Sequence, residues 1–503
     1  MQGGDDQADD AAEGAGGRAM EMMNEDPGAL VPELALLGAA VLGLLAGSWL
    51  PRHRQWLVAA LAGVACVVGI IATAVVYTRP AETVFGSYAI DATTNATRLI
   101  VLVATLLAVC ASVDAARGQR RETEYWVLLL LGALGSVLMA GATDLLLLFA
   151  AFLLASIPLY ALVGWSATST GTEGAMKYYL SGAFAGVTMI TGVTLLYAAG
   201  RVTAYEPLRE NLTAIAAGGR SIPALAAVGL VAVLAGLAFK AGAVPAQFWV
   251  PDVSDGAPAP VAGIVTTIPK IGALVATYRL LTQAIPEQTI DWPLLAAILA
   301  AASMTLGNLA AFFQTSVQRL LGYSAISQVG YVLMAAAVAT RTPQAGPALL
   351  LYLAAYAITN LGAFAVAAAV TTPGGPARTL DDYRGLSRRR PALAAALVVC
   401  LLGLVGTPPT AVFLGKLTVF TAAIDGGMVW LTVLAVLNTV ASLFYYLRWI
   451  APLFAAEHHD QDATEHHSAP RHWASAGAIS AAAATLILGI GGGLLTGLLT
   501  NTL

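Results

Sequence analysis

Residues 234–252 read LAGLAFKAGAVPAQFWVPD, an apolar stretch long enough to cross a membrane but interrupted by Pro245, with Lys240 just before the proline. Proline removes a backbone donor and kinks a helix. In lipid, each carbonyl freed in this way needs a partner from the protein or from water. We therefore expect a broken membrane helix beside a polar cavity, with a lysine at the break.

A second stretch, residues 401–420, repeats this pattern as LLGLVGTPPTAVFLGKLTVF, with Pro408 and Pro409 in mid-segment and Lys416 after them. The two breaks lie five expected membrane helices apart. Because five is odd, two sets of five helices cross the membrane in opposite senses. Inverted repeats with discontinuous helices at matching positions are typical of transporters. Ordinary proline kinks are the alternative, and a lysine beside both breaks favours the repeats.

The whole chain is predicted to be an all-α, polytopic membrane protein. Of its 503 residues, 58% are hydrophobic and 11% are charged, and a spanning helix needs about 20 apolar residues. About fourteen such helices are expected, near residues 29–50, 55–77, 95–116, 123–141, 144–165, 174–200, 222–249, 257–283, 291–313, 318–339, 345–371, 391–422, 427–453 and 473–498. They divide the chain into a tail (1–28), a three-helix segment (29–116), two five-helix repeats (123–283 and 291–453), a His-rich loop (454–472) and a last helix (473–503).

The loop arginines predict the orientation, because cytoplasmic loops carry an excess of Lys and Arg. An even number of helices puts both termini on one side, and placing them outside leaves thirteen loop arginines inside and six outside. The acidic opening, MQGGDDQADDAAEGAGG, has no basic region leading into an apolar run. We interpret it as a solvated, disordered tail rather than a cleaved signal peptide.

All four lysines of the chain lie in expected membrane helices: Lys177, Lys240, Lys270 and Lys416. The arginines, which are the rest of the 25 basic residues, are assigned to the loops. A charge at bilayer depth costs about 2.5–3.5 kcal/mol on insertion scales. A desolvated lysine can release its proton, whereas arginine cannot. The pattern predicts proton or cation movement; snorkelling to the interface suits only Lys177, near a helix start.

Polar side chains in the same helices offer a path between the lysines. Hydroxyls and amides hold ordered water, and a chain of water passes protons; the alternative is that these groups only join helices. Glu173 precedes Lys177 by one turn, a favourable spacing for an ion pair. The further candidates are Thr266, Thr267, Ser324, Ser327, Gln328, Thr359, Asn360 and Asn438.

The sequence carries no recognisable cofactor motif. Cys66, Cys110 and Cys400 lie in different apolar segments without ligand-like spacing, so inert thiols are expected and no iron–sulfur cluster. No glycine-rich nucleotide loop is present, and nothing in the chain suggests a nucleic-acid partner. The loop EHHDQDATEHHSAPRH (457–472) makes a metal site conceivable, but a solvated loop is the favoured interpretation and no metal ligand is predicted.

Seven stretches, within roughly residues 120–450, carry a resemblance to a known family. They are EYWVLLLLGALGSVLMAGATDLLLLF, EGAMKYYLSGAFAG, FKAGAVPAQFWVPDVSDGAPAPV, IPKIGALVATYRLL, MTLGNLAAFFQTSVQRLLGYSAISQVGYVLMA, LLGLVGTPPTAVFLGKL and LNTVASLFYYLRWI. On these stretches the chain resembles the antiporter-like proton-channel subunits of respiratory complex I. The helix count and Lys416 favour the subunit N group. The subunit M group carries glutamate at the position of Lys416, and the subunit L group has a longer chain.

This resemblance implies a role and a setting. Lys177, Lys240, Lys270 and Lys416 match the lysines that form a charged, proton-relaying axis at mid-membrane depth in the family. The chain is then a subunit of NADH-quinone oxidoreductase in a bacterial cell membrane, in contact with lipid and with other membrane subunits, including antiporter-like ones. No cofactor is expected on it, because flavin and iron–sulfur clusters belong to partner subunits. Quinone reduction elsewhere in the complex is expected to drive the protons.

Three positions depart from the family pattern. In FAAFLLASIPLY, Leu153 stands where the family has a glutamate that is expected to pair with the lysine at Lys177. Gln247 and Gln328 stand where histidine is frequent. Without the carboxylate, Lys177 is expected either to be neutral or to pair with Glu173, and the second is favoured. Whether this chain pumps protons therefore stays open.

Three other functions also stay open. The chain is alternatively a subunit of a multi-subunit cation/proton antiporter, a membrane subunit of a hydrogenase-like complex, or a divergent structural paralogue that no longer pumps. Neighbouring genes and co-purifying subunits separate the first two from complex I, whereas only a mutant tests pumping.

Overall fold

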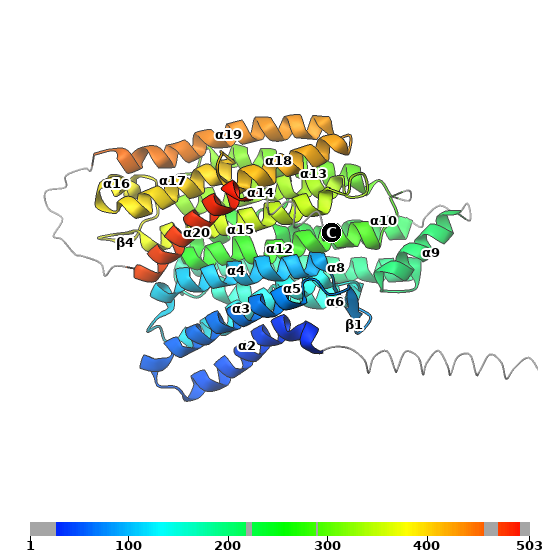
Figure 1. The fold of residues 1–503 in the computed structure, drawn as a ribbon, viewed down its shortest axis with the longest axis horizontal. Helices are drawn as coiled ribbons and strands as arrows, with labels where there is room; N and C mark the ends of the chain where they lie inside the picture. The colour runs from blue at the N-terminus through cyan, green and yellow to red at the C-terminus, as the bar shows by residue number, and fades with distance from the viewer. Residues whose placement is uncertain (1–26, 218–223, 288–289, 457–470, 493–503) are drawn as a thin grey trace, which may run out of the picture.

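The computed structural model describes residues 27–217, 224–287, 290–456 and 471–492 as one helical body with two small β-hairpins (Figure 1). The predicted acidic tail (1–28) and His-rich loop (454–472) lie mainly outside the described residues. The first half contains η1 (Pro27–Leu30), α2 (Val31–Trp49), η2 (Arg52–Arg54), α3 (Trp56–Val76), β1 (Glu82–Val84), β2 (Tyr88–Ile90), α4 (Ala92–Ala116), α5 (Glu122–Gly141), α6 (Leu145–Leu154), α7 (Ile157–Val163), α8 (Ser169–Gly200), α9 (Tyr205–Ala217), α10 (Ala224–Ala241), α11 (Trp249–Gly256) and α12 (Ala259–Gln283). The second half contains α13 (Trp292–Ala311), α14 (Val317–Ala337), α15 (Ala345–Ala369), β3 (Thr371–Thr372), β4 (Gly375–Pro376), η3 (Asp381–Tyr383), α16 (Leu386–Arg389), α17 (Pro391–Val405), α18 (Ala411–Asp425), α19 (Val429–Phe454) and α20 (His472–Ile490).

The predicted membrane-spanning architecture is confirmed. In the described chain, 13 helical segments are long and apolar enough to cross a membrane. Helices α17 and α18 are each too short alone, but together they supply the fourteenth expected crossing. The innermost helices are α12, α14 and α15, whose apolar windows are each 94% buried. Because these three helices have protein on nearly every side, polar groups on them are shielded from lipid.

Both predicted helix breaks are present, at matching places. Residues 242–248 separate α10 from α11, and residues 406–410 separate α17 from α18. Each break belongs to the fourth crossing of its set of five helices. The two sets start at opposite ends of the helical body, α5 at one end and α13 at the other (Figure 1). This arrangement agrees with the expected inverted repeats.

Several local expectations were wrong. The predicted continuous helix 144–165 is divided into α6 and α7, because Pro158 has no N–H to donate to the carbonyl of Leu154. The backbone N–H of Leu159 donates to the carbonyl of Ser156 and not to that of Ala155, and regular helical bonding resumes with Tyr160. Amphipathic helix α9 and the two hairpins β1–β2 and β3–β4 were missed, since each is short and lies in a segment assigned to loops.

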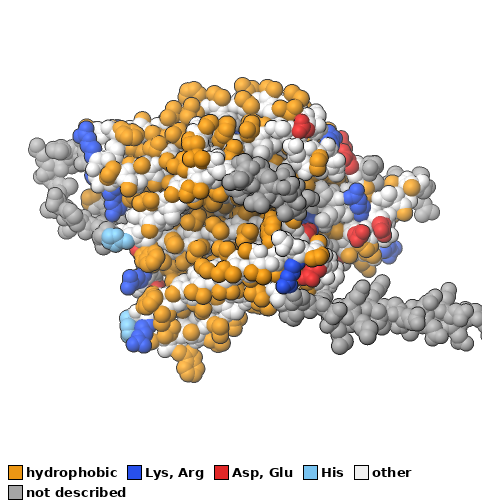
Figure 2. Space-filling view, viewed as in Figure 1, with side chains coloured by type: hydrophobic (Ala, Val, Ile, Leu, Met, Phe, Trp, Pro, Cys, Tyr) orange, Lys and Arg blue, Asp and Glu red, His pale blue; other side chains and the backbone are white. Residues whose placement is uncertain are grey.

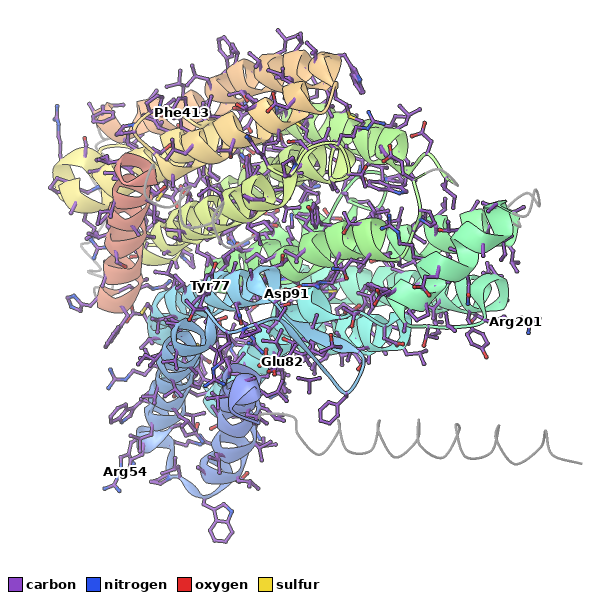
Figure 3. The ribbon with its side chains drawn as sticks, turned by 45° about the vertical axis from the view of Figure 1, so that its right-hand side comes forward. Arg54, Tyr77, Glu82, Asp91, Arg201 and Phe413 are labelled. Carbon is purple, nitrogen blue, oxygen red and sulfur yellow. The ribbon has the colours of Figure 1, made fainter. Side chains whose placement is uncertain are left out.

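Charged side chains gather at the two ends of the helical body. Figure 2 shows hydrophobic side chains along its length, blue Lys and Arg side chains at both ends, and most of the visible acidic side chains at one of them. Arg54 and Arg201 mark the two ends (Figure 3). An apolar belt between two polar ends is what a membrane-spanning protein requires.

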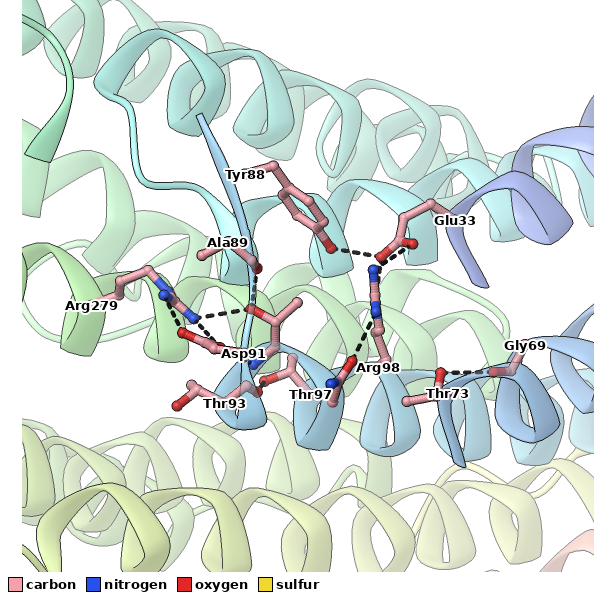
Figure 4. Close-up of polar contacts among 12 residues, drawn as sticks. Glu33, Gly69, Thr73, Tyr88, Ala89, Asp91, Thr93, Thr97, Arg98 and Arg279 are labelled. Carbon is pink, nitrogen blue, oxygen red and sulfur yellow. Dashed lines mark hydrogen bonds and ion pairs between the residues drawn. The ribbon is translucent and has the colours of Figure 1, made fainter. Parts of the chain in front are cut away.

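The assignment of every arginine to a loop was wrong. Arg98 in α4 and Arg279 in α12 are both at least 98% buried. Arg98 donates from Nε and Nη2 to Glu33 (2.7 and 2.8 Å), and Tyr88 donates its hydroxyl to the same carboxylate (Figure 4). Arg279 holds Asp91 through Nη1 and Nη2, each at 2.8 Å. Each buried guanidinium therefore has a carboxylate that comes from a distant part of the sequence.

Candidate functional site: a row of buried lysines

Lys240 lies at the end of α10 and reaches across to the break between α6 and α7. Its Nζ donates to the carbonyl of Ala155 at 3.1 Å. In a continuous helix the N–H of Leu159 would occupy that carbonyl, but here it bonds to Ser156 instead. Lys240 is fully buried. The break that the sequence did not reveal therefore supplies the acceptor for this lysine.

Lys270 lies in α12, beside the break between α10 and α11. Its Nζ donates to the carbonyl of Ala325 in α14 at 3.2 Å, and its side chain is fully buried. Gly242 starts the broken segment with a φ of +72°, and a Cβ added there would lie 3.3 Å from the Nζ of Lys270. The glycine thus allows both a left-handed turn and the close approach of the lysine.

Lys416 lies in α18 and turns back toward the second break. Its Nζ donates to the carbonyl of Val405 (2.8 Å) and to the hydroxyl of Thr439 (3.1 Å). It also lies 4.1 Å from the ring centroid of Tyr331, over the face of the ring. Val405 ends α17, and Pro409, four residues later, has no N–H for its carbonyl. The turn at Gly406 and the proline together leave this carbonyl free for Lys416.

Gln328 lies near the carbonyls that accept from Lys270 and Lys416. It lies one turn beyond Ala325 on α14, and its Nε2 donates to the carbonyl of Leu404 at 2.9 Å. Pro408 has no N–H for that carbonyl, just as Pro409 has none for the next one. Tyr352 donates its hydroxyl to the Oε1 of Gln328. We call Lys240, Lys270 and Lys416 the lysine row, with Gln328 between the last two.

Lys177 does not belong to this row. Its side chain is 48% exposed and forms the predicted ion pair with Glu173 at 2.7 Å. A second partner, Asp252 of α11, lies at 2.8 Å and also binds Arg319 at 2.7 Å. Burial raises the pKa of Asp252, but its contacts with Lys177 and Arg319 outweigh burial and hold the pKa below its usual value. Asp252 was missed, because residues 75 positions apart share no local signal.

The expected relation between Leu153 and Lys177 is wrong. Leu153 packs toward α8 at Gly186, where an added Cβ would lie 3.9 Å from its Cδ2. Nine residues separate Gly186 from Lys177, or about 13 Å along a helix at 1.5 Å per residue. The neighbouring residues Phe152 and Ala155 instead contact Lys240. The leucine therefore lies beside residues that contact Lys240, and away from Lys177.

The other predicted polar residues fall into separate contacts. Gln247, beyond Pro245, is partly buried, and its Oε1 has no hydrogen-bond partner in the described residues. Asn360 donates to Thr266 (3.2 Å) and Thr267 (2.8 Å). The remaining contacts are Thr359 with Thr485 (2.9 Å), Ser324 with Tyr446, and Asn308 with the Oδ1 of Asn438 (3.0 Å). Most of these groups join helices, and no hydrogen bond between side chains connects Lys240 to Lys270 in the described chain.

In the described residues, no group of three or more His, Cys, Asp or Glu side chains could hold a metal ion. The predicted cysteines are separate thiols; Cys66 and Cys400 are buried and Cys110 is partly buried. Residues 457–470, with the paired histidines, lie outside the described residues. The described residues therefore provide no built metal centre.

Comparison with known proteins identifies close relatives. The family described as "NADH:quinone oxidoreductase/Mrp antiporter, TM" matches residues 142–442. The protein "NADH-quinone oxidoreductase subunit N 1" of Streptomyces griseus subsp. griseus is 59% identical over 472 residues, covering 94% of this chain and 97% of that protein. "NADH-quinone oxidoreductase subunit N" of Mycobacterium sp. (strain JLS) is 49% identical, covering 92% and 96%.

Solved structures share the fold. A chain of respiratory complex I from Thermus thermophilus matches with a TM-score of 0.77 and 32% identity, covering 93% of this chain and 98% of that one. A chain of the Mrp complex from Dietzia sp. DQ12-45-1b matches with a TM-score of 0.82 and 21% identity, covering 95% and 97%. The second likeness concerns the fold alone.

Proposed function

Because the chain belongs to the NADH:quinone oxidoreductase/Mrp antiporter membrane family, in its subunit N group, we propose that the lysine row carries protons through the membrane arm of complex I. The observation that carries this proposal is the surroundings of the row. In the described residues, Lys240, Lys270 and Lys416 are all at least 97% buried, and none of them forms an ion pair.

Each lysine of the row donates to a backbone carbonyl, not to a carboxylate. Burial disfavours the charged form of an amine, whereas a carbonyl acceptor favours it. Two acceptors, Ala155 and Val405, lie at the C-terminal ends of α6 and α17, where the helix dipole adds partial negative charge. A small movement of either helix end therefore changes the stability of the ammonium. Such a movement is how quinone chemistry elsewhere in the complex would be coupled to the row.

Lys177 has a different part in this proposal. With Glu173, Asp252 and Arg319 it forms a half-exposed charged cluster. By the positive-inside rule, the arginine-rich end of the protein faces the cytoplasm and both termini face outward. The cluster then collects protons near the inner surface of a bacterial cell membrane. The sets of helices within residues 123–283 and 291–453 are the two halves through which the row passes.

Proton pumping by variants in the assembled complex tests the proposal. Lys240→Ala should lower proton translocation into vesicles by roughly 100-fold, the usual size of a lost proton-transfer group. Lys240→Arg should fail as well, because arginine keeps its proton. Arg341→Ala, which removes a half-exposed basic residue outside the row, is the matched control and should pump normally.

Subunit composition, measured by mass spectrometry, shows whether each variant is assembled and which complex contains the chain. Unchanged pumping per electron in an assembled Lys240→Ala complex contradicts the proposal. Leu153, in place of the family's glutamate, favours a second candidate, a structural subunit that no longer pumps. That candidate predicts that every lysine of the row can be replaced without loss.

A further inference from the structure

We propose that Phe152, Tyr160 and Tyr178 form an aromatic cage that holds the protonated Lys240 by the faces of their rings. This inference rests on the proposed function, because it assigns three positioning residues to the first lysine of the row. It requires no residue outside the described chain.

The cage is built from three helices around an ammonium carried by a fourth. The Nζ of Lys240, on α10, lies 5.2 Å from the ring centroid of Phe152 on α6, 5.8 Å from that of Tyr178 on α8, and 6.0 Å from that of Tyr160 on α7. All three distances are within the range in which a cation is attracted to a ring face. The attraction strengthens when the pair is desolvated, and Lys240 is fully buried. By contrast, the described residues place one such ring, Tyr331, near Lys416.

The rings are fixed in position by their own contacts. Tyr178 stacks on Trp249 with centroids 4.3 Å apart and ring planes at 20°. The indole N–H of Trp249 is anchored to the carbonyl of Phe239 at 3.0 Å. Tyr160 meets Tyr178 edge to face at 4.7 Å. A cage held in this way costs little reorganisation when the lysine gains or loses its proton.

Gly182 leaves room for one wall of the cage. A Cβ added to Gly182 would overlap the hydroxyl of Tyr160, at 1.9 Å. The ring of Tyr178 contacts Tyr160, Trp249 and Lys240, whereas its hydroxyl is buried without a hydrogen-bond partner in the described residues. The ring is therefore the part of Tyr178 that acts on Lys240. This separates the role of the ring from that of the hydroxyl and defines a control.

The pH dependence of pumping in the assembled complex tests the cage. Phe152→Leu removes the nearest ring but keeps an apolar side chain, so the ammonium of Lys240 should lose stability. In a plot of pumping rate against pH, the decline at high pH should then shift to lower pH by about half to one unit. This shift is the equivalent of one cation–π contact. Tyr160→Leu should give a smaller shift in the same direction. Tyr178→Phe keeps the ring and should shift the profile less than Phe152→Leu does.

A second measurement does not depend on pumping. Intact complex is treated with a small membrane-permeant acylating reagent over a range of pH, and modification of Lys240 is read by mass spectrometry of its peptide. Since only the neutral amine reacts, the midpoint of modification should fall in Phe152→Leu and Tyr160→Leu, and it should fall less in Tyr178→Phe, which keeps its ring.

The outcomes separate the two proposals. If both ring-removing variants keep the wild-type midpoint while Lys240→Ala abolishes pumping, the cage is refuted and the proposed function stands. If Lys240→Ala pumps normally but the midpoint falls as expected, the cage stands and the proposed function fails. Equal shifts in Tyr178→Phe and Phe152→Leu would also overturn the cage, because the hydroxyl rather than the ring would then be responsible.

Discussion

Lys416 donates to the carbonyl of Val405, which has no backbone donor in the described chain because the chain turns out of the helix at Gly406 and Pro409 has no N–H. The hydrogen bond is 2.8 Å long, and the residue four positions after Val405 is a proline without an N–H. The preceding carbonyl, that of Leu404, is freed in the same way by Pro408 and accepts from Gln328 at 2.9 Å. The double proline therefore creates two adjacent acceptors for two side chains of the site.

Pro409→Ala should weaken the hold on Lys416. The new backbone N–H can compete for the carbonyl of Val405, so the lysine loses its shortest hydrogen bond and pumping should fall severalfold. Pumping by vesicles containing the assembled variant measures this. Pro391→Ala is the control, because Pro391 opens α17, where a missing N–H has no intrahelical partner to lose. Equal losses in both variants would show that the effect comes from proline removal in general.

Gly242→Ala should impair pumping more than it impairs assembly. The substitution forces an L side chain to a φ of +72° and brings a Cβ within 2.8 Å of Val250 and 3.3 Å of the Nζ of Lys270. The left-handed backbone alone costs about 1–2 kcal/mol. Gly118→Ala is a matched control with a φ of +76° and nothing within 4 Å of the added Cβ. If the two variants pump equally well, contact with Lys270 has no role.

Gln328→Leu should reduce both stability and pumping. The leucine leaves the carbonyl of Leu404 and the hydroxyl of Tyr352 without their partner inside the protein. Each unsatisfied buried group costs about 1–3 kcal/mol. Gln328→His keeps a donor and an acceptor and should retain most of the pumping rate. Thermal unfolding and pumping of the two variants, measured side by side, decide the matter; a histidine variant as impaired as the leucine variant would argue against a bridging role.

Leu153→Glu should act on Lys240 and leave the Lys177 cluster unchanged. A carboxylate on α6 next to the cage favours the ammonium, so the alkaline limb of the pumping profile should move to higher pH, opposite to the effect of Phe152→Leu. Leu153→Gln, similar in size but uncharged, should not move it. A shift equal in the two variants would mean that side-chain polarity, and not charge, is responsible.

The ion pair of Asp91 with Arg279 should make stability depend on acid pH. Burial raises the pKa of Asp91, but its hydrogen bonds and charge contact with Arg279 outweigh burial and lower the pKa. A lowered folded-state pKa contributes stability above the unfolded value of about 3.9, and this contribution is lost as the pH falls through the folded value. The temperature of thermal unfolding should therefore fall below about pH 4 more steeply in the wild type than in Asp91→Asn.

The same variant should be less stable at neutral pH. Removing one partner of a buried ion pair costs about 3–5 kcal/mol, a figure that the partial exposure of Asp91 reduces, since its side chain is 26% exposed. A wild-type and variant difference that stays constant from pH 7 to pH 3 would show that Asp91 does not titrate in this range.

The membrane spans and two of the helix breaks were determined by the sequence itself. A run of apolar residues forms a spanning helix because lipid leaves the backbone no other partners, and the prolines at Pro245 and at Pro408 and Pro409 lie where the helices break. The ion pair of Glu173 with Lys177 was also predictable, because one helical turn brings the two residues together. In each case the physical cause lies within a few residues of its effect.

Only the tertiary structure decided what each buried charge meets. Lys240 finds a carbonyl 85 positions away and Lys270 one 55 positions away, while Asp252 reaches Lys177 over 75 positions. Arg279 and Asp91 are 188 positions apart. No local pattern encodes these partners, because they depend on how whole helices pack. The same packing left Lys177 half-exposed and enclosed Lys240 in aromatic rings, although both are lysines in apolar segments.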